Sequence, residues 1–207
     1  MPVTLRISIT IWTLLLASTS IDGDNLWHFH KQEHGVSVYT KPILHSSLDA
    51  FKAQVTLDAK LEDIRNTILN YSEYPTWYEN YSYGEIIARV SASEFIVRFV
   101  IDVPFPFQDR ESVNRVVVKE SNDRLVIILT SEPDILGSKN DYVRMRVSAG
   151  QWVLRQAPNN QIYVELTYHA DPELPVPGWL ANRFLIDGPI QSLINLRNLV
   201  DRINVDR

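Results

Sequence analysis

Apolar and polar residues alternate along most of this chain, which is the pattern of strands that bury one face of a sheet. In the segment 94–101, Phe95, Val97 and Phe99 share one face, while Arg98 lies on the other. Turn-forming residues separate such segments from one another. The pattern predicts strands over residues 27–33, 36–40, 50–57, 84–91, 94–101, 110–119, 124–131, 142–155 and 161–170.

Three segments have helical character instead. Asp58 is a suitable N-cap for a helix that runs through Leu69, and a shorter helical segment follows over residues 72–78. A long apolar helix, with Pro177 in its first turn, ends the fold. Its stripe at helical spacing consists of Ile186, Ile190, Leu193, Leu196 or Arg197, and Val200. The order of elements predicts an α+β fold with a mostly antiparallel sheet.

Gly188 and Pro189 interrupt the stripe of this last helix. An interior proline removes one backbone hydrogen bond and kinks a helix, and glycine loosens it further. The kink has two interpretations. It is either a hinge over the mouth of a cavity or a bend that wraps the helix around the sheet.

Composition narrows the classes of function. The chain has 207 residues, a formal net charge of −5 and no cysteine. An acidic chain without blocks of lysine or arginine is not typical of nucleic-acid binding. The absence of cysteine excludes disulfides and thiol chemistry. We expect one domain, over residues 26–204, that functions as a monomer.

The N-terminus has the layout of a secretory signal peptide. Arg6 precedes a short apolar run over residues 7–17, and small polar residues follow at 18–20. The run is shorter than the roughly 20 residues that a membrane-spanning helix needs. We therefore expect residues 1–20 to be removed and the protein to be periplasmic or secreted; an uncleaved anchor is the alternative.

Three segments together resemble a known family. They are PFPFQDRESVNR at 104–115, YVRMRVSAGQWVL at 142–154, and VELTYHADPELPVPGWLANRFLIDGPIQSLINLR at 164–197. In their residues and in their order along the chain, they resemble the bacterial branch of the START lipid-binding domains, in the helix-grip superfamily. The resemblance covers nearly all of the chain after its N-terminal segment. It implies a curved antiparallel sheet wrapped around the long C-terminal helix, with an internal apolar cavity.

The resemblance also implies ligand-binding residues. A buried arginine paired with a carboxylate would meet the polar end of an apolar ligand, and Arg146 or Arg110 is the candidate. Asp109 and Glu111 are the possible counter-charges. From alternation alone, Arg146 either faces solvent or points into the cavity. The other candidate lining residues are apolar or aromatic: Trp77, Val97, Phe99, Tyr168, Trp179 and Phe184.

We therefore expect non-catalytic binding, with possible transfer or sensing, of a lipid or other hydrophobic small molecule, without cofactor or metal. One alternative is a helix-grip enzyme, a cyclase or hydrolase of a small hydrophobic compound, with His169 as a general base. Another is an interaction module whose core is filled. The apolar loop at 104–107 is either a surface for transient membrane contact or a packed turn.

Overall fold

The computed structural model describes residues 26–137, 141–171, 173 and 177–205. One ten-stranded sheet dominates it, in the order β1-β2-β3-β10-β9-β7-β6-β5-β4, and all of these neighbours are antiparallel. The strands are β1 (His28–Glu33), β2 (Val36–Lys41), β3 (Ala50–Leu57), β4 (Tyr81–Ser91), β5 (Glu94–Ile101), β6 (Arg110–Glu120), β7 (Arg124–Ser131), β8 (Val143–Arg144), β9 (Ser148–Gln156) and β10 (Ile162–Ala170).

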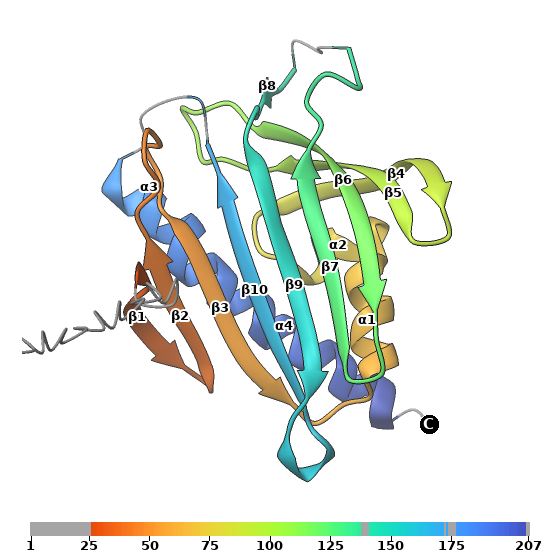
Figure 1. Cartoon of the computed structure of the whole chain (residues 1–207). Coiled ribbons are helices and arrows are strands. Elements are labelled where there is room, and N and C mark those ends of the chain that lie inside the picture. Colours follow the sequence, from red (N-terminus) through yellow and green to blue (C-terminus); the bar gives the residue numbers. More distant parts are fainter. Residues whose placement is uncertain (1–25, 138–140, 172, 174–176, 206–207) are drawn as a thin grey trace, which may run out of the picture.

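Helices lie against one face of this sheet (Figure 1). They are α1 (Leu61–Leu69), η2 (Tyr71–Glu73), α2 (Tyr74–Trp77), α3 (Gly178–Asn182), the π-helical turn η4 (Arg183–Asp187) and α4 (Gly188–Val205); a short turn η3 (Pro158–Asn160) joins β9 to β10. This arrangement confirms the predicted helix-grip fold. The first helix differs in detail, because its N-cap is Lys60 rather than Asp58 and no side chain caps it.

The predicted stripe of α4 packs against the sheet. Ile190, Leu193, Leu196 and Val200 are buried and belong to the main apolar core. This core also contains the inward face of β5, so the alternation in residues 94–101 assigns that face correctly. Burial of these apolar side chains supplies most of the driving force for laying the helix on the sheet.

The interruption at Gly188 and Pro189 takes the form of a π-helical turn. The N–H of Gly188 bonds to the carbonyl of Arg183, five residues earlier, so the turn widens just before Pro189. A Cβ atom at Gly188 would lie 2.9 Å from that carbonyl oxygen and 3.1 Å from Nδ2 of Asn80. Glycine therefore allows the close approach of this turn to the chain before β4.

The strand predicted over residues 142–155 is broken in the structure. β8 pairs in parallel with the start of β6, whereas β9 pairs with β7 and β10. The chain changes partner between them, and the N–H of Met145 bonds to the carbonyl of Glu111 at 2.9 Å. Alternation could not reveal this change, because both pieces have strand character.

A buried ionic cluster on the outer face of the sheet helps to hold β8 beside β6. The carboxylate of Glu111 accepts hydrogen bonds from Nε of Arg98 and, at 2.8 Å, from Nε of Arg144. Arg144 also donates to the carbonyl of Leu136 at 3.2 Å. Burial alone would raise the pKa of Glu111, but these two guanidinium groups hold it below its ordinary value. The cluster ties β8 both to β6 and to Leu136, which follows β7.

Several loops gather at one end of the sheet, uppermost in Figure 1. Here β2, β5, β7 and β10 end, and β3, β4, β6 and β9 begin. We call this end, with its connecting segments at 42–49, 102–109, 132–137 and 141–147, the rim. Residues from distant parts of the sequence meet there because the sheet is antiparallel.

Candidate functional site

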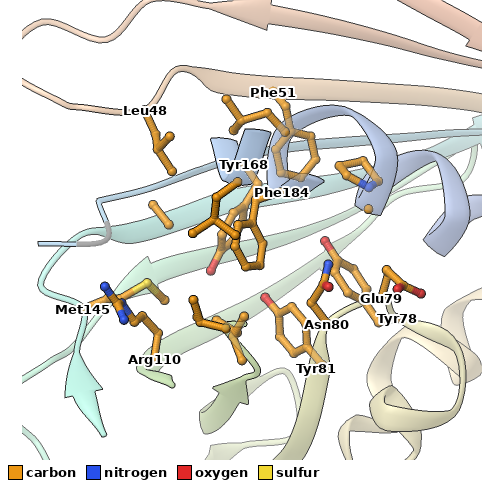
Figure 2. Close-up of a pocket in the computed structure, with 17 residues that line it drawn as sticks. Leu48, Phe51, Tyr78, Glu79, Asn80, Tyr81, Arg110, Met145, Tyr168 and Phe184 are labelled. Atoms are coloured by element: carbon orange, nitrogen blue, oxygen red, sulfur yellow. The ribbon is translucent and has the colours of Figure 1, made fainter. Parts of the chain in front are cut away.

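A pocket of about 100 Å³ lies at the rim, between the sheet and the start of the last helical region (Figure 2). Leu180, Phe184 and Leu185, with Gly188 and Pro189, cover it from the helical side. The sheet and its loops supply the other walls. These are lined by Leu48, Phe51, Tyr78, Glu79, Asn80, Tyr81, Ile101, Val103, Arg110, Met145, Tyr168 and Ala170. Most of the surface of the pocket is apolar.

Arg110 is the principal charged group in this apolar wall. It is the first residue of β6, is only 3% exposed, and lies beside Met145 in Figure 2. One terminal nitrogen donates to the carbonyl of Gln108, but Nε is buried and has no hydrogen-bond partner. Burial lowers the pKa of Arg110, and the nearby charge of Asp109 partly opposes that shift. The guanidinium still carries its charge at neutral pH.

The expected counter-charges do not pair with Arg110. Glu111 points to the opposite face of β6, where Arg98 and Arg144 hold it. The Oδ1 atom of Asp109 accepts the N–H of Val103 at 2.9 Å. Within the described part of the chain, no carboxylate forms an ion pair with Arg110. The expected ion pair is therefore not formed among the described residues: Asp109 acts on Arg110 only through its nearby charge, and no carboxylate is bonded to the guanidinium.

Three tyrosines add hydroxyl groups to the site. Tyr78, Tyr81 and Tyr168 line the pocket, and burial raises the pKa of each, so all three are neutral at physiological pH. The hydroxyl of Tyr168 hydrogen-bonds with that of Ser148, whose carbonyl accepts the side-chain amide of Asn114. The polar groups behind the pocket wall are thus fixed in place.

Three of the predicted ligand residues line this pocket: Arg110, Tyr168 and Phe184. Arg146 does not, because its side chain is 68% exposed and lies 3.5 Å from the carboxylate of Asp134. The break between β8 and β9 places Met145 inside the pocket and Arg146 outside. Trp179 is also outside, with 57% of its surface exposed on α3. The prediction that these two residues line the cavity is wrong.

Trp77, Val97 and Phe99 are buried but lie deeper than the pocket, in the packed core. Trp77 and Phe99 belong to a group of rings in mutual contact that we call the aromatic plug: Tyr71, Tyr74, Trp77, Tyr78, Tyr81, Phe99 and Trp152. Only Tyr78 and Tyr81 of this group also line the pocket. Val97 and Phe99 lie on the inward face of β5, as the alternation predicts, and Trp77 lies on α2, but none of the three reaches the pocket.

The sequence reading missed several lining residues. Leu48 lies in the loop before β3, outside any periodic pattern, and Met145 lies in the segment 142–155, for which the sequence predicts only a strand. Asn80 has a left-handed backbone conformation with φ of 64°, and its Oδ1 accepts Nε of Arg183 at 2.9 Å. An asparagine just before a strand is a signal for such a turn, but not for a contact with the last helical region.

Candidate metal ligands do not gather in this structure. Among the described residues, no group of three or more histidine, aspartate or glutamate side chains is arranged to hold a metal ion. The charged groups at the pocket are Arg110 and Glu79, and the neutral donors are the tyrosines. Such a set can orient a polar end of a mainly apolar molecule.

The START domain family profile matches residues 19–199. The chain belongs to the START domain family. It is 27% identical, over 186 residues, to the uncharacterized protein PA1579 of Pseudomonas aeruginosa; the match covers 85% of this chain and 87% of that protein. This family membership agrees with the resemblance of the three sequence segments.

Solved structures show the same fold. The STAR-related lipid transfer protein of Xanthomonas axonopodis superposes with a TM-score of 0.75 at 24% identity, over 85% of this chain and 99% of that fragment. Human StAR-related lipid transfer protein 5 gives a TM-score of 0.78 at 18% identity, over 88% of this chain and 90% of its own. START domains bind hydrophobic ligands, and the apolar pocket at the rim is the candidate site for such a ligand.

We predict that Phe184→Asp abolishes uptake of a fluorescent hydrophobic probe while leaving the fold largely intact. Phe184 is half-buried at the pocket wall, so a carboxylate there can turn towards solvent. Probe fluorescence and circular dichroism measure the two effects. Leu193→Asp is the control, because Leu193 is fully buried in the core and a charge there should unfold the protein. If Phe184→Asp also unfolds it, Phe184 belongs to the core.

Proposed function

We propose that this START domain binds, without catalysis, a hydrophobic small molecule that carries an anionic or strongly hydrogen-bond-accepting group. The observation that supports this most directly is Arg110. Its guanidinium is buried at an apolar pocket, lacks a carboxylate partner among the described residues, and has an unsatisfied Nε. A ligand with such a group would complete the site.

The magnitudes favour this arrangement. Removing an ion from water costs several kcal/mol in a protein interior unless it is paired and hydrogen-bonded. A ligand carboxylate or phosphate at Arg110 would offset part of that cost. Each methylene of an apolar tail contributes about 0.8 kcal/mol on burial. The tail would thus supply affinity, and the arginine would supply orientation and selectivity for the head group.

Binding rather than catalysis is favoured by the position of His169, the general base suggested by the sequence. Tyr168 faces the pocket, and successive side chains of a strand point to opposite faces. His169 therefore faces away from the site, where its Nδ1 is buried without a partner. A reaction in this pocket would need a different base from the one that the sequence suggested.

We also propose that the rim makes transient contact with a membrane surface. Phe105 is 96% exposed and Leu44 is 83% exposed, each in a rim loop, and Trp179 is exposed on α3 nearby. Exposed aromatic and aliphatic side chains around the mouth of an apolar pocket suit the boundary between water and lipid. None of the described helices is long and apolar enough to cross a membrane.

Export to the periplasm or the cell exterior is part of the proposal. It rests on the signal-peptide pattern of residues 1–20, which lie outside the described residues.

We predict that Arg110→Met lowers the affinity for octanoate about tenfold to a hundredfold, the usual worth of a hydrogen bond to a charged group. Methionine keeps the aliphatic stem and removes an unpaired buried charge, so the unfolding temperature should stay the same or rise. Titration calorimetry and thermal unfolding measure both quantities. Arg146→Met is the matched control and should change neither, because Arg146 is at the surface. Unchanged octanoate binding in Arg110→Met would refute the proposed head-group contact.

For the membrane contact, we predict that replacing both Leu44 and Phe105 with serine reduces co-sedimentation with phosphatidylcholine vesicles. The serines remove apolar area that would enter the lipid surface. Val205→Ser is the control, because Val205 is also exposed but lies at the end of α4, away from the rim (Figure 1). Equal loss in this control, or no vesicle association of the wild type, would argue against the rim as the contact surface.

For export, we predict that the N-terminal sequence of the extracytoplasmic protein begins between Thr19 and Asp24. The short apolar run with Arg6 before it directs cleavage after the small polar residues. Edman sequencing of the periplasmic or secreted fraction measures this. An intact Met1 in the membrane fraction would instead indicate the uncleaved anchor.

A further inference from the structure

The pocket occupies only one end of the space between the sheet and the helices. Arg110 and Met145 lie at one side of the pocket, and Tyr78 and Glu79 lie at the other (Figure 2). Beyond Tyr78 the interior is filled by the aromatic plug. A tail that extends inward from a head group at Arg110 therefore meets Tyr78.

From this division we propose that the ligand is a short single-chain or single-ring acid, and that the aromatic plug sets the limit on its length. The inference rests on the proposed function, because it assumes that the pocket is the ligand site. It goes further by excluding long-chain acids and two-chain lipids as molecules that the pocket can enclose.

The rings of the plug are closely packed at its boundary with the pocket. The ring of Tyr78 stacks on that of Tyr74 with centroids 5.4 Å apart and planes 1° apart. Its ring centroid lies 4.5 Å from that of Tyr81 and 6.3 Å from that of Trp152, and both pairs are T-shaped. Tyr78 thus has rings on several sides, and little room remains for it to turn aside.

Hydrogen bonds hold the segment that carries the plug. The hydroxyl of Tyr74 donates to the carbonyl of Ile68 at 2.9 Å, which ties this ring to the end of α1. The side-chain amide of Asn195 donates to the carbonyl of Trp77 at 2.9 Å. The hydroxyl of Ser192 accepts the N–H of Glu79, also at 2.9 Å. The segment before β4 is therefore fixed to both α1 and α4, and opening the plug would break these bonds.

Size supports the same conclusion. An engineered cavity of about 150 Å³ in another protein accommodates benzene, whereas this pocket has about 100 Å³. Some widening on binding is available at the helical side, where Phe184 and Leu185 are only half-buried. The plug side offers no comparable freedom, because Trp77 and Trp152 are almost fully buried and closely packed.

A chain-length series tests the proposal. Calorimetric titration of the wild type with butanoate, octanoate, dodecanoate and octadecanoate should show affinity rising about fourfold for each methylene that is buried. The rise should stop by dodecanoate, where the tail reaches the plug. Octanol should bind more weakly than octanoate, because it lacks the charge that Arg110 would meet.

Two tyrosine variants locate the limit. Tyr78→Leu removes ring volume at the boundary and should move the optimum to a longer acid. Tyr71→Leu is the matched control: it removes a buried ring of the same plug that does not line the pocket, so the optimum should stay unchanged. An identical optimum in folded Tyr78→Leu and wild type would overturn the role of the plug.

The wild-type series decides the length limit even if Tyr78→Leu fails to fold. Affinity that continues to rise through octadecanoate would refute a short ligand while leaving the proposed function intact. Failure of every acid to bind would refute both, so the two proposals are distinguishable.

Discussion

The site depends on one electrostatic constraint, a guanidinium buried in an apolar wall. Arg110 begins β6, its Nε has no partner, and no described carboxylate pairs with it. The neighbouring carboxylate of Glu111 does not pair with Arg110, because it forms ion pairs with Arg98 and Arg144 on the other face of the sheet. The charge at the pocket is therefore left for a ligand. The cost of keeping it unpaired is the physical basis for selecting an acidic head group.

The rest of the fold supports this arrangement. The outer ionic cluster fixes β8, and β8 brings Met145 into the pocket beside Arg110. On the other side, the π-helical turn and Gly188 allow the last helical region to approach the segment before β4 closely. The aromatic plug fills the remaining interior, so the same helix-grip interior provides a stable core at one end and a small pocket at the other.

The sequence predicts the fold well, because strand alternation and the apolar stripe of α4 are properties of local periodicity. The family resemblance adds the order in which these elements assemble. Depth is different. Phe99 and Tyr168 both lie on inward strand faces, yet only Tyr168 reaches the pocket, and this depends on which rings pack between them and the rim.

The arginines illustrate a second limit of sequence analysis. Arg110 and Arg146 were equal candidates, and the structure separates them through the break between β8 and β9. That break arises from the pairing of β8 with β6 and from the attraction between Arg144 and Glu111. These two side chains come from parts of the sequence that are far apart. Periodicity within 142–155 contains no information about either partner. Long-range pairing therefore decides which side chain enters the site.

Nuclear magnetic resonance gives the most direct test of an acidic ligand at Arg110. During titration with octanoate, the Nε–H resonance of Arg110 should shift to low field and become protected from exchange, with matching shifts of the Met145 and Leu185 methyl groups. The Arg146 resonance should stay in place. Saturable binding that leaves the Arg110 signal unchanged, or that shifts only surface residues, would contradict the account.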